Sequence, residues 1–161
     1  HALKAHGLER VAIIDFDVHH GNGTEDCFAG DDQVLMCSIF QHPFYPYSGA
    51  EKPAANMCNV PLAAGSGGEE FRDAVMQVWT PRLKEFKPQM IFVSAGFDAH
   101  YEDDMGGLKL VEKDYAWCTE HLKKLAAEMC NKRIVSMLEG GYVMTSLARS
   151  VGAHLRALAD L

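Results

Sequence analysis

Acidic and imidazole side chains occupy every second position of the run Asp15-Phe16-Asp17-Val18-His19, which follows an apolar stretch. If the extended geometry continues, Asp15, Asp17 and His19 point to one side, and Phe16 and Val18 point to the other. Two ionised carboxylates at the end of a buried strand repel each other unless a cation lies between them. The run therefore predicts a metal site. The alternative is a pair of Asp residues that cap a helix beside a hydrogen-bonded His.

A second polar group follows a later apolar stretch, in Ser94-Ala95-Gly96-Phe97-Asp98. Two carboxylates and one imidazole would fill three positions of a zinc ion and leave the fourth for water, as in catalytic zinc sites. Iron or cobalt would also accept such a set. In isolation an Asp in this place more often caps a helix, but the preceding D-x-D-x-H run favours a ligand.

The third segment is Glu139-Gly140-Gly141-Tyr142, again after an apolar stretch. Paired glycines let the backbone approach a ligand closely, and a Tyr hydroxyl just after them can donate to a developing oxyanion. A tight turn with a packing Tyr would give the same sequence. The position of the segment, at a third strand end, favours a functional role.

The elements that must position these segments alternate between strands and helices. Strands are predicted at 11–16, 34–40, 90–94 and 133–138, and helices after the 21–24 turn and at 69–86, 112–130 and 144–159. This βαβα order predicts an α/β fold with a parallel sheet, whose ligands bind at the carboxyl ends of the strands. Residues 41–68 are predicted to be an irregular, functional loop. Because four strands are few, we expect an unpaired sheet edge that pairs within a larger protein or a homo-oligomer.

Composition narrows the possible partners. The 161 residues suit one domain, and 48% apolar with 23% charged residues predicts a folded chain. A net charge of -7 argues against direct binding to nucleic acid or anionic lipid, and no apolar run is long enough for a membrane span. Five cysteines without a C-x-x-C pair are expected to be free thiols, which favours a cytoplasmic location.

The three polar segments, D-x-D-x-H-H-G-N-G, S-A-G-F-D-A-H and E-G-G-Y, together resemble the arginase-like deacetylase superfamily. That superfamily includes histone deacetylases, acetylpolyamine amidohydrolases and bacterial proteins related to acetoin utilisation, and the resemblance covers nearly the whole chain. It implies a three-layer αβα fold of the arginase/deacetylase type. Residues 1–161 would form one domain, the C-terminal part of a deacetylase catalytic domain, without its N-terminal strands.

The resemblance also implies a reaction. Zinc would be held by Asp17, His19 and Asp98, and Tyr142 would polarise the acyl carbonyl. The expected reaction is hydrolysis of an N-acyl amide, such as acetyl-lysine or an acetylpolyamine, by a metal-activated water. The sequence does not distinguish between these substrates.

A second cation follows from the resemblance and not from spacing. Asp15 matches a buried Asp that supports a catalytic His and holds a potassium ion. The remaining potassium ligands would be Ser38 and the backbone carbonyls of Asp17, His19 and Ile39.

Other positions would line the substrate site. Tyr45 falls where the family places an aromatic wall of the acyl-lysine tunnel, and Met105 falls at its apolar rim; ordinary loop packing explains both equally well. Gly140 and Gly141 would border the substrate. Asn22 stands behind the metal ligands where other members have Asp, a choice that resembles class II and bacterial members.

One family feature has no match here. The family's adjacent His-His pair, which supplies the general base, lies before the D-x-D run, and His1 and His6 are not adjacent and lie in an expected helix. We therefore expect this chain alone to be nearly inactive. The alternatives are a metal-binding or regulatory module without catalysis, and a two-metal ureohydrolase. The last needs a D-x-H-x-D run, which the sequence lacks.

Overall fold

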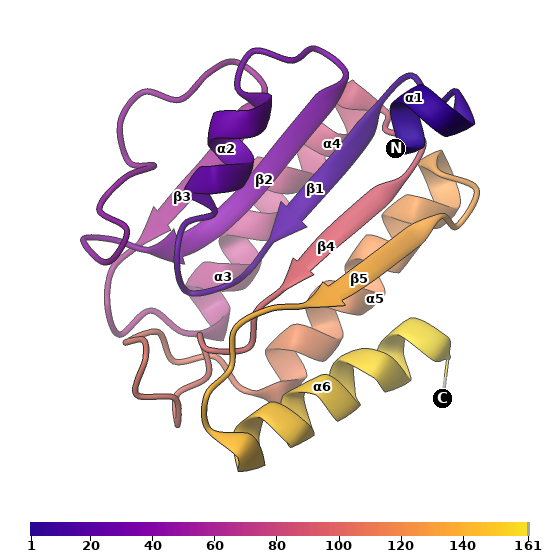
Figure 1. Cartoon of the computed structure of the whole chain (residues 1–161). Coiled ribbons are helices and arrows are strands. Elements are labelled where there is room, and N and C mark those ends of the chain that lie inside the picture. The colour runs from indigo at the N-terminus through magenta and orange to yellow at the C-terminus, as the bar shows by residue number, and fades with distance from the viewer. Residues whose placement is uncertain (161) are drawn as a thin grey trace.

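A computed structural model describes residues 1–160, and its centre is a five-stranded sheet with the order β3-β2-β1-β4-β5 (Figure 1). All neighbouring strands are parallel, which confirms the predicted α/β class. The strands are β1 (Val11–Asp15), β2 (Val34–Gln41), β3 (Met57–Leu62), β4 (Ile91–Ala95) and β5 (Ile134–Leu138). The helices are α1 (Ala2–His6), α2 (Asn22–Phe28), α3 (Gly68–Ala74), the π-helical turn η1 (Val75–Trp79), α4 (Thr80–Phe86), α5 (Glu112–Met129) and α6 (Met144–Ala159).

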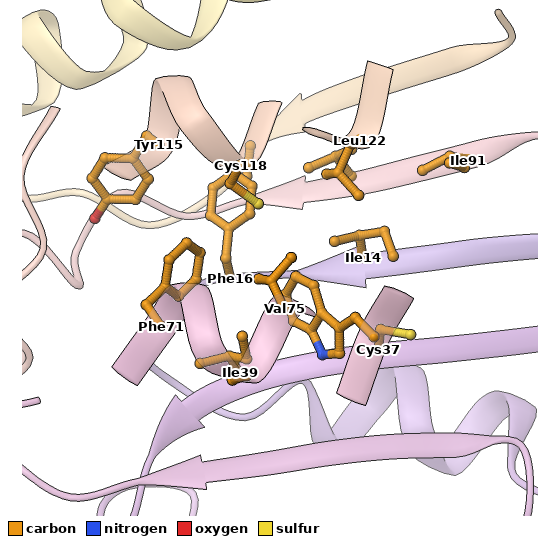
Figure 2. Packing of buried hydrophobic residues seen from close by; sticks show 14 of the residues in the cluster. Ile14, Phe16, Cys37, Ile39, Phe71, Val75, Ile91, Tyr115, Cys118 and Leu122 are labelled. Carbon is orange, nitrogen blue, oxygen red and sulfur yellow. The ribbon is translucent and has the colours of Figure 1, made fainter. Parts of the chain in front are cut away.

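The core lies between the sheet and one layer of helices. Alternate strand residues, such as Ile14 and Phe16 after it, enter a single buried cluster with side chains of the helices. Figure 2 shows Phe71 and Val75 from the helical layer in one cluster with Phe16 and Ile39, and Tyr115 of α5 packs against Phe16. This packing fixes the position of the end of β1 relative to the helices, and therefore the position of the residues that follow it.

The two faces of the sheet are covered unequally. Helices α3, α4 and α5 lie behind the sheet in Figure 1, whereas α2 alone lies in front of it. Helix α6 belongs to the same layer as α3, α4 and α5. Its His154 contacts Thr119 of α5 through Nδ1 (2.6 Å) and Ser136 of β5 through Nε2 (2.9 Å). The second helical layer is therefore thin in the described part of the chain.

Strand β3 corrects the prediction of an irregular stretch from residue 41 to residue 68. It pairs with β2 from Met57 to Leu62 and forms one edge of the sheet. Asn59 and Pro61 break the apolar pattern that would have revealed it. Proline lacks a backbone N–H and is tolerated on an edge strand.

The helix predicted at 69–86 is present but is not uniform. It runs as α3, η1 and α4, and the π-helical turn η1 ends two residues before Pro81. Since Pro81 has no N–H and its ring clashes with the preceding turn, a regular α-helix cannot continue through it. The Thr80 backbone N–H and hydroxyl both donate to the Val75 carbonyl, the hydroxyl at 2.8 Å. Helix α2 also begins two residues earlier than Thr24, inside the predicted turn.

Strand β5 is the second edge, and it is the most exposed strand. Val135 and Met137 are 40% and 41% exposed, and Val135 continues a row of partly buried residues through Phe92 and Ile13. Strand β5 is therefore an end strand with exposed side chains, and the pairing expected at an exposed edge stays a prediction.

Two further sequence expectations can be compared with the described residues. All five cysteines are free, and four of them are buried, with Cys27 exposed. Across residues 1–160, no helix combines the length and apolarity needed to cross a bilayer.

Candidate active site

The site lies where β1, β4 and β5 end side by side. Asp15 pairs with Ser94, and Ala95 with Leu138, so the segments after these residues leave the same edge of the sheet. This is the carboxyl edge, where α/β proteins bind ligands. Segments far apart in the sequence thus meet at one place.

The structure brings together the three predicted metal ligands. One ligand atom each from Asp17, His19 and Asp98 lies within 4.8 Å of the other two. His19 Nδ1 lies 2.9 Å from Asp17 Oδ1 and 3.2 Å from Asp98 Oδ2. Within the described residues this is the one group of three or more such side chains close enough to share an ion.

Backbone hydrogen bonds fix the two carboxylates. The Val18 N–H donates to Asp98 Oδ1 (2.8 Å), and the Gly140 N–H donates to Asp17 Oδ2 (3.1 Å). Asp98 is fully buried, and its Oδ2 has no hydrogen bond of acceptable geometry among the described residues. A buried carboxylate oxygen without a donor is costly, so this atom suits a cation.

Two glycines make room for the carboxylates. A Cβ added to Gly140 would overlap the Asp98 and Asp17 carboxylate oxygens, and one added to Gly96 would overlap Asp17. The Gly140 backbone therefore lies close to both carboxylates, and its approach to a bound ligand stays a prediction. Gly141 serves the turn, with φ at 133°.

The charges of the cluster depend on one another. The hydrogen bond to Asp17 and the nearby Asp98 carboxylate raise the pKa of His19 from 6.5 to about 10. Burial raises the pKa of Asp98, and although burial also opposes ionisation of Asp17, its hydrogen bonds with His19 lower the pKa of that carboxyl. Without a metal the imidazolium is the counterion of the two carboxylates. A divalent cation would take over that role.

Asp15 lies apart from this cluster. It is buried, its Oδ1 accepts the Asp17 N–H (3.1 Å), and burial followed by the charge of Asp17 raises its pKa well above the usual range. Ser38 lies opposite Asp15 in the β1–β2 register, and Ile39 follows it in β2. These buried oxygens match the chemistry of a monovalent cation, which stays a prediction.

The aromatic wall involves a residue that the sequence analysis missed. Phe44 stacks on His19 with ring centroids 5.5 Å apart and an interplanar angle of 22°. The predicted wall residue, Tyr45, meets the same ring edge-on at 6.1 Å and is 65% exposed. Met105 is also exposed, at 46%. The adjacent aromatic pair before Pro46 was the signal that could have identified Phe44.

A buried network beneath this loop was also missed. His20, next to the predicted ligand His19, pairs through Nε2 with Glu25, which also accepts Asn59 Nδ2 (2.9 Å). Asn59 Nδ2 donates to the Gly49 carbonyl (3.1 Å) and so ties the aromatic loop to β3. The only sequence signal for this network was the second His of the His19-His20 pair.

Tyr142 follows the glycine pair and is 54% exposed. Burial, and then the charges of Asp98, Asp17 and Asp103, raise the pKa of its hydroxyl, which stays protonated and able to donate at neutral pH. Its backbone N–H donates to Asp103, a buried residue that the sequence analysis did not single out. Asn22, predicted to lie behind the ligands, is exposed.

Comparison with known proteins agrees with this arrangement. Residues 1–158 match the family profile described as "Histone deacetylase domain". The chain belongs to the histone deacetylase family. It is 42% identical to type-2 histone deacetylase 2 of Dictyostelium discoideum over 96% of this chain and 10% of that protein. It is also 42% identical to the chloroplastic histone deacetylase 14 of Arabidopsis thaliana, over 98% of this chain and 39% of that protein.

Solved structures of the family confirm the expected arginase/deacetylase fold. The chain superposes on the crystal structure of the HDA15 HD domain with a TM-score of 0.89 at 32% identity. The match covers 98% of this chain and 46% of that one. Residues 1–161 thus span less than half of the histone deacetylase chains named above. Zinc is the metal associated with this family. The two carboxylates and one imidazole, the Asp98 oxygen that accepts no hydrogen bond and the close glycines fit it.

The raised pKa of His19 predicts that metal binding releases a proton. At pH 7.5 the imidazole carries a proton that a metal must displace from Nδ1, so zinc affinity should rise with pH until about pH 10. Isothermal titration calorimetry of the metal-free chain, in buffers of different ionisation enthalpy, should give about one proton released per zinc. A binding enthalpy independent of the buffer would contradict this.

The close contact between Gly140 and the two carboxylates predicts that a side chain at this position weakens metal binding. Gly140→Ala should weaken zinc binding by about 10- to 100-fold, because the new methyl group displaces both carboxylates. Gly23→Ala is the matched control, since a Cβ there meets no atom within 4 Å. Competition with a chromophoric chelator measures both variants, and equal affinities would show that the carboxylates can move without loss.

Proposed function

We propose that the complete product of the gene encoding this chain is a zinc-dependent deacylase that hydrolyses N-acyl amides such as acetyl-lysine or acetylpolyamines. The observation that carries the proposal is the convergence of Asp17, His19 and Asp98 within 4.8 Å, beside the Gly140-Gly141-Tyr142 turn. Membership of the histone deacetylase family supports the same chemistry. Zinc in this set would polarise an acyl carbonyl and lower the pKa of water.

The chain's own groups would complete the reaction centre. Asp17 and Asp98, held by backbone N–H groups, offer oxygens in fixed positions, so little reorganisation is needed on binding. Tyr142 stays protonated and can donate its hydroxyl hydrogen to the acyl oxygen as negative charge develops there. Phe44 stacks on His19 and, with Tyr45 and Met105, offers an apolar surface that suits the aliphatic arm of an acyl-lysine.

Potassium is proposed as a second, structural cation. Asp15 and Ser38 are buried and lie opposite each other on adjacent strands, with Ile39 following Ser38. The Asp17 and His19 carbonyls would complete this set, as the family resemblance implies. A monovalent cation there would offset the burial of the Asp15 carboxylate.

We propose that the 161-residue chain by itself hydrolyses acyl amides only slowly. No residue among them matches the family's His-His pair, since His19 belongs to the metal cluster and His20 pairs with Glu25. Loss of a general acid or base typically costs about 10²- to 10⁴-fold in rate.

Turnover of an acetyl-lysine fluorogenic substrate and an acetylpolyamine panel tests the function. The complete gene product should be active and lose activity on chelation, and Tyr142→Phe should lower kcat by about 10²- to 10³-fold with zinc content unchanged. Tyr47→Phe, which removes a hydroxyl from a Tyr that is 73% exposed, is the matched control. Zinc binding without turnover of any acyl amide would favour the regulatory-module alternative.

We also propose that the exposed edge of β5 is covered, either by other parts of a longer protein or by a second copy. Val135 and Met137 are exposed there on the end strand of the sheet. An uncovered strand edge is a template for pairing.

Sedimentation velocity measures this pairing. The 161-residue chain should associate as its concentration rises, and Met137→Lys should suppress the association. Met76→Lys is the control, because Met76 is 42% exposed but lies on η1, away from this edge. A chain that stays monomeric at all concentrations would exclude the second copy as the partner.

A further inference from the structure

Asp103 is a buried carboxylate in the loop between β4 and α5, and the metal cluster does not include it. It is 4% exposed, while its neighbour Asp104 is exposed. No Lys, Arg or His within residues 1–160 lies within ion-pair distance of Asp103. Burying an acidic side chain without a cationic partner needs strong compensation from hydrogen bonds.

That compensation comes from backbone N–H groups on two loops. Asp103 Oδ2 accepts the N–H groups of Tyr142 (2.7 Å) and Val143 (3.3 Å), and Oδ1 accepts the N–H of Met105 (3.0 Å). The Asp103 N–H donates to the His100 carbonyl (2.9 Å), which holds the carboxylate in place. One side chain therefore joins the Tyr142 turn to the loop that carries Met105.

The position of Asp103 also suits the start of α6. Val143 is the N-cap of this helix and makes no side-chain cap, and the first turn contains no acidic residue. A helix N-terminus carries unsatisfied N–H groups and partial positive charge, which favour a nearby carboxylate. Asp103 supplies that carboxylate from a distant part of the chain.

The turn before Tyr142 has little side-chain anchoring of its own. Gly140 and Gly141 precede it, and Gly141 has a φ of 133° that other residues rarely adopt. Gly140 is held through its carbonyl by the Phe97 N–H (2.8 Å) and through its N–H by Asp17, and the Tyr142 N–H is held by Asp103. Because the Tyr142 side chain is 54% exposed, its direction depends on these backbone contacts.

We infer that Asp103 is a positioning residue of the active site, which fixes the backbone of Tyr142 relative to Met105 and thereby aims the Tyr142 hydroxyl at the acyl oxygen. The inference rests on the proposed deacylase function. Asp103 does not touch the reacting atoms; it acts through Tyr142. A purely structural role, as a cap of α6, would change stability without acting through the Tyr142 hydroxyl.

The first test is kinetic and uses the zinc-loaded complete gene product. Asp103→Asn keeps the size and one acceptor oxygen, and it should lower kcat by about 10- to 100-fold, with KM changed less than about threefold and zinc content unchanged. Asp103→Ala should lower kcat further. Asp104→Asn, which removes the same charge from the exposed neighbour, should match the wild type.

A double-mutant cycle separates positioning from stability. In a Tyr142→Phe background, Asp103→Asn should cost less than about threefold in kcat, because the hydroxyl that it aims is already absent. Equal losses in both backgrounds would overturn the inference.

Hydrogen exchange tests the anchor without any turnover. The amides of Tyr142 and Val143 should exchange at least about tenfold faster in Asp103→Asn than in the wild type or Asp104→Asn. Unchanged exchange would overturn the inference even if the enzyme is active. If the wild type hydrolyses no acyl amide, the proposed function fails and so does the catalytic part of the inference, while the exchange result still decides whether Asp103 anchors the turn.

Discussion

The repulsion between two carboxylates, Asp17 and Asp98, is the constraint around which this edge of the sheet is built. Each carboxylate receives a backbone N–H from another segment, and both lie beside the His19 imidazole. A positive charge between the carboxylates, from the imidazolium or a metal, offsets this repulsion. Gly96 and Gly140 leave no side chain that could separate them.

The hydrophobic core supports this arrangement from behind. Phe16 and Phe97 each precede a predicted ligand by one residue and point into the core, where their rings meet at 5.9 Å. Tyr115 lies against both rings and donates its hydroxyl to the Phe97 carbonyl (3.2 Å). Alternation along the chain thus places core side chains and ligands on opposite sides of the same short segments.

The sequence predicted the parts of this structure that follow regular patterns. Continuous apolar runs identified β1 and β2, and the polar residues after the strands located the site, because parallel strands end at one edge. Strand β3 was not predicted because Asn59 and Pro61 interrupt its run of apolar residues. Phe44 and Asp103 were not predicted because their roles depend on how irregular loops fold onto the site. Neither periodicity nor spacing encodes such loop conformations.

The separation of the ligands along the chain has a consequence for folding. Val18 and Asp98 are 80 residues apart in sequence, and α2, β2, β3, α3, η1, α4 and β4 lie between them. An ion held by His19 and Asp98 would act as a cross-link that closes this long loop in the native state only. Binding of that kind stabilises the folded chain by mass action. The supply of metal in the cell would then set the balance between folded and unfolded protein, even when no substrate is present.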